Sequence, residues 1–210
     1  MYAIVLLFLV PAALAYSRGP PVGDAGLCTD MIPTGHNGGV SEATDKDNPP
    51  YTITTSSDMY YAGGTVTVTI AGTGATMFKG FFIQARRTHL SMDTDEAIGT
   101  FFGAPTGTQL LKCTVANSSW GHSNGNERTT IEATWNAPKQ DEGPIMFKAT
   151  IVKGDPNRNY FYTNVTSDVM EFTKTPSTTP SSTASSVTVP LVLMTTIALG
   201  LAALLAARRQ

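Results

Sequence analysis

Apolar and polar residues alternate with a period of two through the middle of the chain, and this pattern limits what the chain can fold into more than any other feature. In segment 65–70, TVTVTI, three aliphatic residues fall on one side and three threonines on the other. Segments 130–135 and 145–151 repeat the pattern with larger side chains. Successive side chains of a strand point to opposite faces, so each segment is expected to form a half-buried strand of an antiparallel sheet.

Shorter segments of the same kind occur on both sides of these three. Clusters of Gly, Pro, Asn and Asp separate them, as in AGG at 62–64 and GDPN at 154–157, and no long helical period intervenes. The sequence therefore predicts an all-β protein, a two-sheet sandwich of about seven to nine antiparallel strands. The additional strands are expected at 51–56, 78–87, 98–102, 109–114, 160–163 and 169–173.

One predicted strand, 78–87, reads FKGFFIQARR and carries apolar residues on both faces. That composition is typical of a central strand or of one packed under a loop, where Gln84 would need hydrogen-bond partners. Its cations, Lys79, Arg86 and Arg87, fall near the strand ends, where aliphatic stems can cover apolar surface while charged heads reach water. Solvated strand ends are one interpretation. In the other, the three cations are candidate ligand contacts that form a basic patch for anionic glycans or lipid head groups.

The two ends of the chain have the composition of targeting and membrane segments. Residues 1–15 hold an apolar run followed by the small-residue pattern of a secretory signal peptide. Residues 187–207 carry no charge and are long enough to cross a bilayer as a helix, with residues 208–210 as a short cytoplasmic tail. Residues 174–186 are mostly Ser, Thr and Pro, which predicts an O-glycosylated stalk. The remaining segment, 16–173, fits one extracellular domain.

The apolar C-terminal segment also fits a second interpretation, the signal for a glycosylphosphatidylinositol anchor. Small residues, a polar spacer and a hydrophobic tail are all present from Ser177 onward. The terminal Arg208 and Arg209 favour an intact single-pass type I span, because they match the positive-inside rule. Under either interpretation the folded domain is expected at the cell surface.

The chain has two cysteines, Cys28 and Cys113. In the oxidising secretory route such a pair is expected to form a disulfide that closes a long loop. A metal or redox role is the other interpretation, although neither cysteine has CxxC spacing or a histidine at ligand spacing. Two sequons, at Asn117 and Asn164, predict N-glycosylation in a secreted chain.

Residues that could carry catalysis or bind a metal are scattered along the chain. His36, His89 and His122 lie far apart, so ordinary hydrogen-bonded histidines are expected in place of a metal site. The acidic run 93–96 lacks the glycine and the bidentate glutamate of a calcium loop, and a solvated hairpin loop is expected there. There is no GxSxG element, and the formal net charge of -2 argues against a nucleic-acid partner. The sequence predicts a non-enzyme without cofactor or metal.

Dispersed motifs in a fixed order resemble the reeler (Reelin) domain family. They include GLCTDMIPTGH at 26–36, FKGFFIQAR at 78–86, WGHSN at 120–124, TIEATWNAP at 130–138 and GPIMFKATIV at 143–152. The resemblance covers essentially the whole predicted extracellular domain. It implies an immunoglobulin-like β-sandwich, similar to small invertebrate defence proteins with a single reeler domain that contact microbial surface components.

This resemblance implies a cell-surface binding protein of innate immune defence that contacts microbial glycoconjugates or matrix glycans. One alternative is an adhesion or accessory protein that binds a protein or matrix partner. Another is an accessory subunit related to the ferric-chelate reductases, which also contain a reeler domain. Those relatives ligate haem through histidines in membrane helices, whereas the candidate span at 187–207 contains none, so no intrinsic electron transfer across a membrane is expected.

Overall fold

The structure, a computed structural model, describes residues 18–23 and 26–174. The predicted signal peptide, the stalk beyond Lys174, the membrane segment and the tail lie outside this part of the chain. Within it, no helix is long and apolar enough to cross a membrane. The elements are α1 Leu27–Asp30, β1 Tyr51–Thr55, β2 Met59–Tyr60, β3 Thr65–Gly72, β4 Gly80–Arg87, β5 Thr100–Phe102, β6 Thr108–Leu111, β7 Ser119–His122, β8 Thr130–Asn136, β9 Ile145–Val152, β10 Phe161–Thr166 and β11 Glu171–Phe172, with short 3-10 turns at Asn37–Gly39 and Thr73–Ala75.

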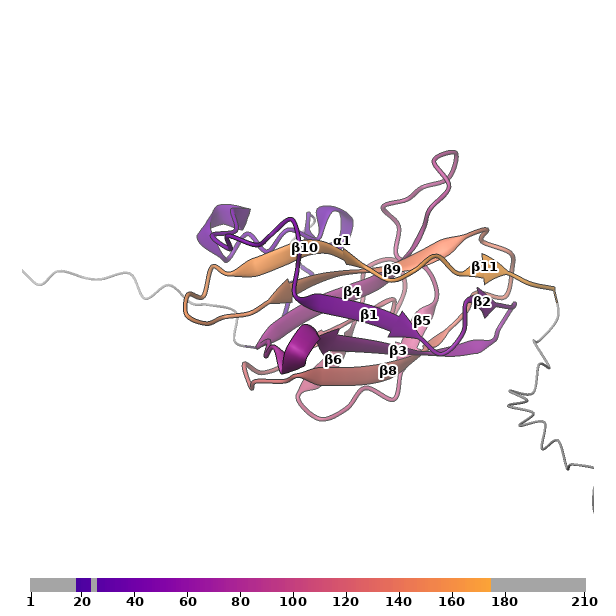
Figure 1. The fold of residues 1–210 in the computed structure, drawn as a ribbon. Coiled ribbons are helices and arrows are strands. Elements are labelled where there is room, and N and C mark those ends of the chain that lie inside the picture. The colour runs from indigo at the N-terminus through magenta and orange to yellow at the C-terminus, as the bar shows by residue number, and fades with distance from the viewer. Residues whose placement is uncertain (1–17, 24–25, 175–210) are drawn as a thin grey trace, which may run out of the picture. The chain divides into compact units, whose positions relative to one another are not determined.

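Nine of the described strands form the two sheets of a β-sandwich (Figure 1). One sheet has the order β1-β3-β8-β5 and the other the order β10-β9-β4-β7-β6, and neighbours within both sheets are antiparallel. The predicted all-β sandwich is therefore confirmed. Strands β2 and β11 form a separate pair, and this pair is parallel, so the prediction of antiparallel strands alone was incomplete.

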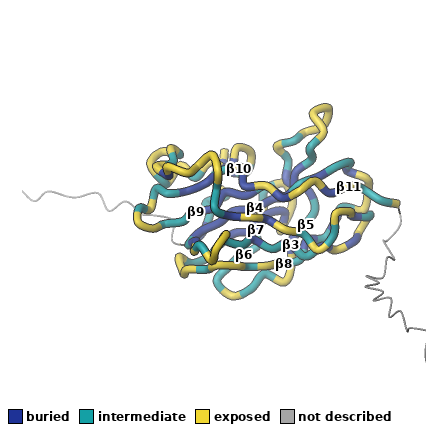
Figure 2. Tube along the Cα trace, in the orientation of Figure 1, coloured by how far each residue is buried: buried dark blue, intermediate teal, exposed yellow. Residues whose placement is uncertain are grey.

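The hydrophobic core lies between the two sheets and is built from the alternating residues of the predicted strands (Figure 2). In β3, Val66, Val68 and Ile70 are buried, and the threonines between them are more exposed. In β8, Ala133 and Trp135 face the same core. Period-two alternation thus identified the buried face of these strands correctly.

Strand β4 lies between β9 and β7, near the middle of the five-stranded sheet. Its Phe81 and Ile83 point into the main core, whereas Phe82 belongs to a second apolar cluster on the outer face, together with Leu27 and Met31. Both explanations predicted for a strand with apolar residues on its two faces are therefore correct. β4 is a central strand, and the N-terminal segment covers its outer face.

Strand β7 was not predicted. It is only four residues long and contains Gly121, so it lacks a clear alternation, yet it pairs with both β4 and β6. The strand expected at 109–114 ends at Leu111, because the chain turns there toward Cys113. Short strands that depend on their neighbours for pairing leave little signal in the sequence.

Candidate functional site

The chain before the first strand crosses the outer face of the five-stranded sheet and forms a small slot with it. A disulfide joins Cys28 in α1 to Cys113 after β6, the pair that the sequence predicts. Thr150 Oγ1 of β9 donates a 2.6 Å hydrogen bond to the carbonyl oxygen of Met31. Met31 is fully buried and packs in the same cluster as Phe82. The N-terminal segment is thus fixed covalently, by a hydrogen bond and by apolar packing.

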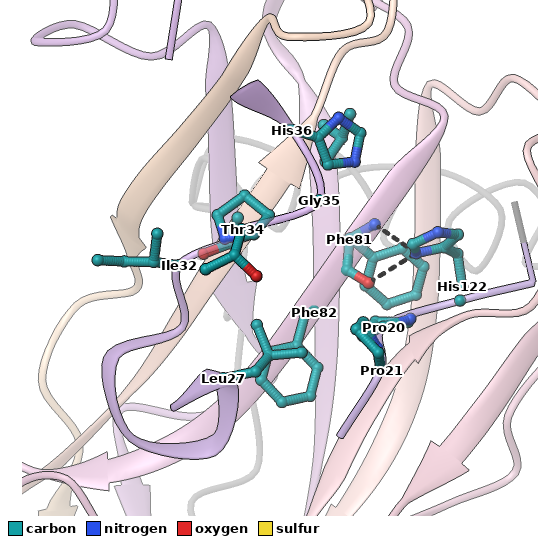
Figure 3. Close-up of a pocket in the computed structure, with 14 residues that line it drawn as sticks. Pro20, Pro21, Leu27, Ile32, Thr34, Gly35, His36, Phe81, Phe82 and His122 are labelled. Atoms are coloured by element: carbon teal, nitrogen blue, oxygen red, sulfur yellow. Dashed lines mark hydrogen bonds between the residues drawn. The ribbon is translucent and has the colours of Figure 1, made fainter. Parts of the chain in front are cut away.

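The slot is lined mainly by apolar side chains and has polar groups at its rim (Figure 3). Leu27 and Phe82 lie together in the outer apolar cluster and form part of its wall. Thr34, His36 and His122 also line it. Its volume is about 40 Å³, well below the ~300 Å³ of a typical small-molecule pocket. The slot can therefore hold one end of an apolar chain, but not a whole sugar.

Both slot histidines are held by backbone groups. His36 Nδ1 lies 2.7 Å from the carbonyl oxygen of Arg158; a carbonyl only accepts, so this nitrogen carries a proton. His122 Nδ1 lies 3.1 Å from both the backbone nitrogen and the carbonyl oxygen of Phe81. His89 lies elsewhere, with Nδ1 2.7 Å from Ser91 Oγ.

The structure brings two of the three predicted histidines, His36 and His122, to the same slot, although they are far apart in sequence. Gly80 explains the position of one of them, because a Cβ on this glycine would lie 3.0 Å from His122 Cε1. Across residues 18–23 and 26–174, no group of three or more His, Cys, Asp or Glu side chains is placed to hold a metal ion.

The three candidate ligand-contact cations do not form a free basic patch. Lys79 Nζ lies 2.7 Å from Asp155 Oδ2 and 3.6 Å from Glu127 Oε1. The hydrogen bond to Asp155 is the main reason that the pKa of Lys79 is raised. Both interpretations of the sequence placed the heads of Lys79, Arg86 and Arg87 in water. The structure corrects this for Arg86 and Arg87, whereas the Lys79 side chain stays 34% exposed beside its carboxylate partners.

Arg86 is buried, with 1% of its surface exposed. Its guanidinium donates to Gln84 Oε1 at 2.7 Å and to the carbonyl oxygen of Cys28 at 2.7 Å. It also donates to the Thr94 carbonyl at 3.2 Å and lies 3.5 Å from Asp95 Oδ1. Burial lowers the pKa of Arg86, and Asp95 opposes this effect. A buried cation with these partners joins β4 to α1 and to the β4–β5 loop, and does not contact external ligands.

Arg87 is paired with two carboxylates. Its guanidinium lies 2.5 Å from Glu142 Oε2 and 2.8 Å from Glu96 Oε2. The acidic run lies in a largely exposed loop, as expected, although this loop joins strands of different sheets and is not a hairpin. Asp95 and Glu96 are in addition the partners of the two arginines. The β4–β5 loop is braced in this way at its base and protrudes from the domain, with Leu90 93% exposed (Figures 1 and 2).

The two predicted glycosylation sites have different surroundings. Asn117 is exposed in the turn before β7, as expected, but the hydroxyl of Ser119 in the same sequon is buried and accepts a 3.0 Å hydrogen bond from Gln84 Nε2. Asn164 lies in strand β10. It is nevertheless exposed, because the strand bulges there, and Thr166 of its sequon is exposed as well. Glycan attachment at both sites stays a prediction.

The slot itself was missed from the sequence. Its walls come from four separate parts of the chain: the N-terminal segment 19–36, strand β4 at Phe82, strand β7 at His122, and strand β9 at Thr150 and Val152. Two signals could have pointed to it: the apolar residues on the second face of segment 78–87, and the motifs at 26–36 and 120–124, which both end or centre on a histidine. Neither signal indicates that these segments lie next to one another in the folded chain.

Comparisons with known proteins give a family match and several relatives. Residues 26–178 match the Reeler domain. A candidate defence protein of the Hdd11-like type from Samia ricini is 34% identical over 158 residues, which cover 72% of this chain and 86% of the relative. A candidate ferric-chelate reductase 1 homologue of Drosophila melanogaster is 29% identical over 205 residues, covering 89% of this chain and 30% of the relative. Among solved structures, the human F-spondin reeler domain is 23% identical, covers 59% of this chain and 88% of that chain, and gives a TM-score of 0.49.

Proposed function

Because this chain belongs to the reeler domain family, we propose that it is a cell-surface binding protein of innate immune defence that contacts microbial surface glycoconjugates through its apolar slot. Its relationship to candidate defence proteins of Samia ricini and Hyphantria cunea supports the defence role. The predicted signal at 1–15 and the predicted span or lipid anchor at 187–207 support the cell-surface location. The proposed contact is a binding event without a reaction.

The slot is the single observation that carries the choice of ligand. Lipopolysaccharide and lipoteichoic acid join sugars to acyl chains, and the slot joins an apolar wall to a polar rim. The end of an acyl chain would pack against Leu27 and Phe82, with about 0.8 kcal/mol for each CH₂ group removed from water. Sugar hydroxyls would meet Thr34 and His36 at the rim.

Charge contributes little to this proposed contact, because Lys79, Arg86 and Arg87 are already paired with groups of the protein. Salt screens the attraction between separated charges over about 10 Å at 0.1 M ionic strength and 3 Å at 1 M. The affinity of binding through the slot should therefore change little with salt concentration. Binding through a free basic patch would instead weaken strongly as the salt concentration rises.

The test uses cells that display the full chain and fluorescent forms of lipopolysaccharide, lipoteichoic acid and β-glucan. Ile32→Asp places a charge in the slot, and Val40→Asp makes the same change at an exposed residue outside it. Ile32→Asp should lower affinity about tenfold, the loss of roughly two CH₂ contacts. Val40→Asp should have no effect.

Deacylated lipopolysaccharide should bind as weakly to the normal chain as the intact glycolipid binds to Ile32→Asp. Saturable binding that is equal for the acylated and deacylated forms would show that the binding site is not the slot. No saturable binding to any of these glycoconjugates, at normal surface expression, would refute the proposed function.

A second candidate function, binding of a protein partner, is favoured by the β4–β5 loop. The base of the loop is held by Arg86 and Arg87, and its tip exposes Leu90 to solvent. A protein partner could therefore pack an apolar side chain against Leu90. Proximity labelling on intact cells tests it. One dominant neighbour should be lost in Leu90→Asp and kept in Val115→Asp, which introduces an aspartate in place of another exposed aliphatic residue.

A further inference from the structure

Strand β10 forms one edge of the five-stranded sheet, next to β9. An edge strand offers backbone groups to which another chain can add a strand, and proteins protect such edges by bulges, charges or covering segments. Ser41 covers the beginning of β10, because its hydroxyl donates a 2.5 Å hydrogen bond to the carbonyl oxygen of Phe161. Lys46, Asp47 and Pro49 face the second half of the strand across a cleft, and no backbone hydrogen bond joins them to it among the described residues.

The second half of β10 contains a bulge that presents Asn164. The pairing of β10 with β9 shifts register between Tyr162 and Val165. Asn164 has a φ of 59°, a left-handed conformation in which asparagine is enriched among non-glycine residues. Asn164 and Thr166 are exposed while Val165 between them is buried. The asparagine and the hydroxyl residue of an Asn-Val-Thr sequon therefore both face solvent.

A polar cleft of about 310 Å³ lies beside this bulge. Ser41, Lys46, Asp47 and Thr163 line it together with Asn164 itself. The ammonium group of Lys46 can donate hydrogen bonds, the carboxylate of Asp47 can accept them, and the hydroxyl of Thr163 can do both. A mixed set of donors and acceptors at this spacing suits the hydroxyl and amide groups of a sugar.

We propose that Asn164 carries an N-linked glycan whose first sugar lies in this cleft and which covers the outer edge of β10. In the attachment step, the amide nitrogen of Asn164 bonds to the anomeric carbon of a lipid-diphosphate oligosaccharide. The carbon–oxygen bond to the diphosphate breaks, the amide nitrogen loses one proton, and the lipid diphosphate leaves. The glycan then occupies the position that an added strand would take, so it keeps two copies of the chain from pairing edge to edge.

Asn117 provides the internal control. It has nearly the same backbone conformation, with a φ of 63°, but it lies in the turn between β6 and β7 and not along a strand edge. Replacing it tests whether loss of any sequon has the same effect. The inference is independent of the slot and of the proposed glycoconjugate contact.

The experiment expresses the full chain in cultured insect cells and compares the normal chain with Asn164→Gln, Thr166→Ala and Asn117→Gln. Surface staining first establishes that each variant has passed through the secretory route. Asn164→Gln and Thr166→Ala should both lose the mass of one glycan, and a peptide N-glycosidase should then remove one glycan fewer from them than from the normal chain. An unchanged mass in both variants overturns the attachment site.

Cross-linking on intact cells tests the covering role. The dimer fraction should rise in Asn164→Gln and Thr166→Ala, and it should stay at the normal level in Asn117→Gln. The normal chain, treated with the glycosidase after it has folded, should dimerise like the two variants, which removes any effect on folding. A lost glycan with no rise in the dimer fraction, or an equal rise in Asn117→Gln, overturns the proposal that the glycan protects the edge.

Discussion

Arg86 Nη2 donates a 2.7 Å hydrogen bond to the carbonyl oxygen of Cys28, so a buried cation on the central strand holds one half of the disulfide. Gln84 accepts a bond from the same guanidinium, and its Nε2 donates to Ser119 Oγ and to Cys113 Sγ. The two ends of the disulfide therefore contact one buried polar network. The position of the N-terminal segment, and with it the slot, depends on this network.

Replacing Arg86 with methionine should destabilise the fold by about 3 kcal/mol. The change leaves the Cys28 carbonyl and Gln84 Oε1 without a donor, and each buried unsatisfied group costs about 1–3 kcal/mol. Urea denaturation, followed by the fluorescence of the core residues Trp120 and Trp135, measures the loss. Lys79→Met is the control and should have little effect, because its ion pairs lie near the surface. Equal stability of Arg86→Met and the normal chain would show that the network contributes nothing.

Two glycines next to β5 should respond differently to the same substitution. Gly99 and Gly103 have φ values of 65° and 66°, so alanine costs about 1–2 kcal/mol at both positions through backbone strain. At Gly99 the new Cβ would also lie 2.4 Å from the ring of Trp135, whose Nε1 donates to the Ile98 carbonyl. At Gly103 it would meet no atom within 4 Å.

Gly99→Ala should therefore lower the free energy of unfolding by about 2–5 kcal/mol, because overpacking adds about 1–3 kcal/mol to the strain. Gly103→Ala should lower the free energy of unfolding only by the cost of backbone strain. The midpoints of thermal unfolding of the two variants provide the comparison. Similar midpoints would mean that the Trp135 ring can move aside at little cost.

Removal of the disulfide should loosen the N-terminal segment before the rest of the domain. Cys28 and Cys113 are 85 positions apart, and a bridge over a loop of that length contributes about 4.6 kcal/mol in the chain-entropy account. In the variant with both cysteines replaced by serine, hydrogen exchange should accelerate most at the amides of Asp30 and Met31, which bond within α1. The amides of the β3–β8 ladder should exchange only with global unfolding. Uniform acceleration at all sites would contradict this order.

The stability of the domain should fall in alkaline solution because of its buried tyrosines. Burial raises the pKa of Tyr60 to about 12, and it does the same for Tyr51. The unfolded state loses these protons near pH ~10. The contribution of each tyrosine to the free energy of unfolding is therefore complete below that pH. It is lost as the pH rises to ~12, by up to about 1.4 kcal/mol per pH unit. The Tyr60→Phe variant has no ionisable group at this position.

At neutral pH Tyr60→Phe should be less stable than the normal chain, because the Tyr60 hydroxyl donates a 2.7 Å hydrogen bond to the Gly143 carbonyl. The difference should narrow as the pH rises from ~10 to ~12. Urea midpoints measured across this range test the expectation. A constant difference would mean that Tyr60 ionises alike in the folded and unfolded states.

Much of the fold could be predicted from the sequence because the strands of the core carry their signal locally. The alternation in β3, β8 and β9 identifies both the strand and its buried face within a few residues. Segment 78–87 even indicated the second apolar layer, through Phe82. These properties depend on the period of a strand and not on the rest of the chain.

The site could not be predicted in the same way, because its contacts join distant parts of the chain. Arg87 pairs with Glu142, 55 positions away, and Arg86 bonds to Cys28, 58 positions away. A cation that reaches water and a cation that pairs with such a distant partner have the same local sequence. The sequence could therefore not show that Arg86 is buried or that Arg87 is paired with Glu142, nor that separate segments of the chain form the slot.

The parallel pairing of β11 with β2 also has a mechanical consequence. A force applied along β11 by the chain that follows it would load its hydrogen bonds in shear, so that they resist together and do not open one by one. These bonds run from the Glu171 amide to the Asp58 carbonyl at 3.0 Å and from the Thr173 amide to the Tyr60 carbonyl at 2.8 Å. The tension would pass through Tyr60 into the Gly143 carbonyl. A domain tethered at this end would thus transmit a pull to the loop whose Glu142 holds Arg87 at the end of the central strand.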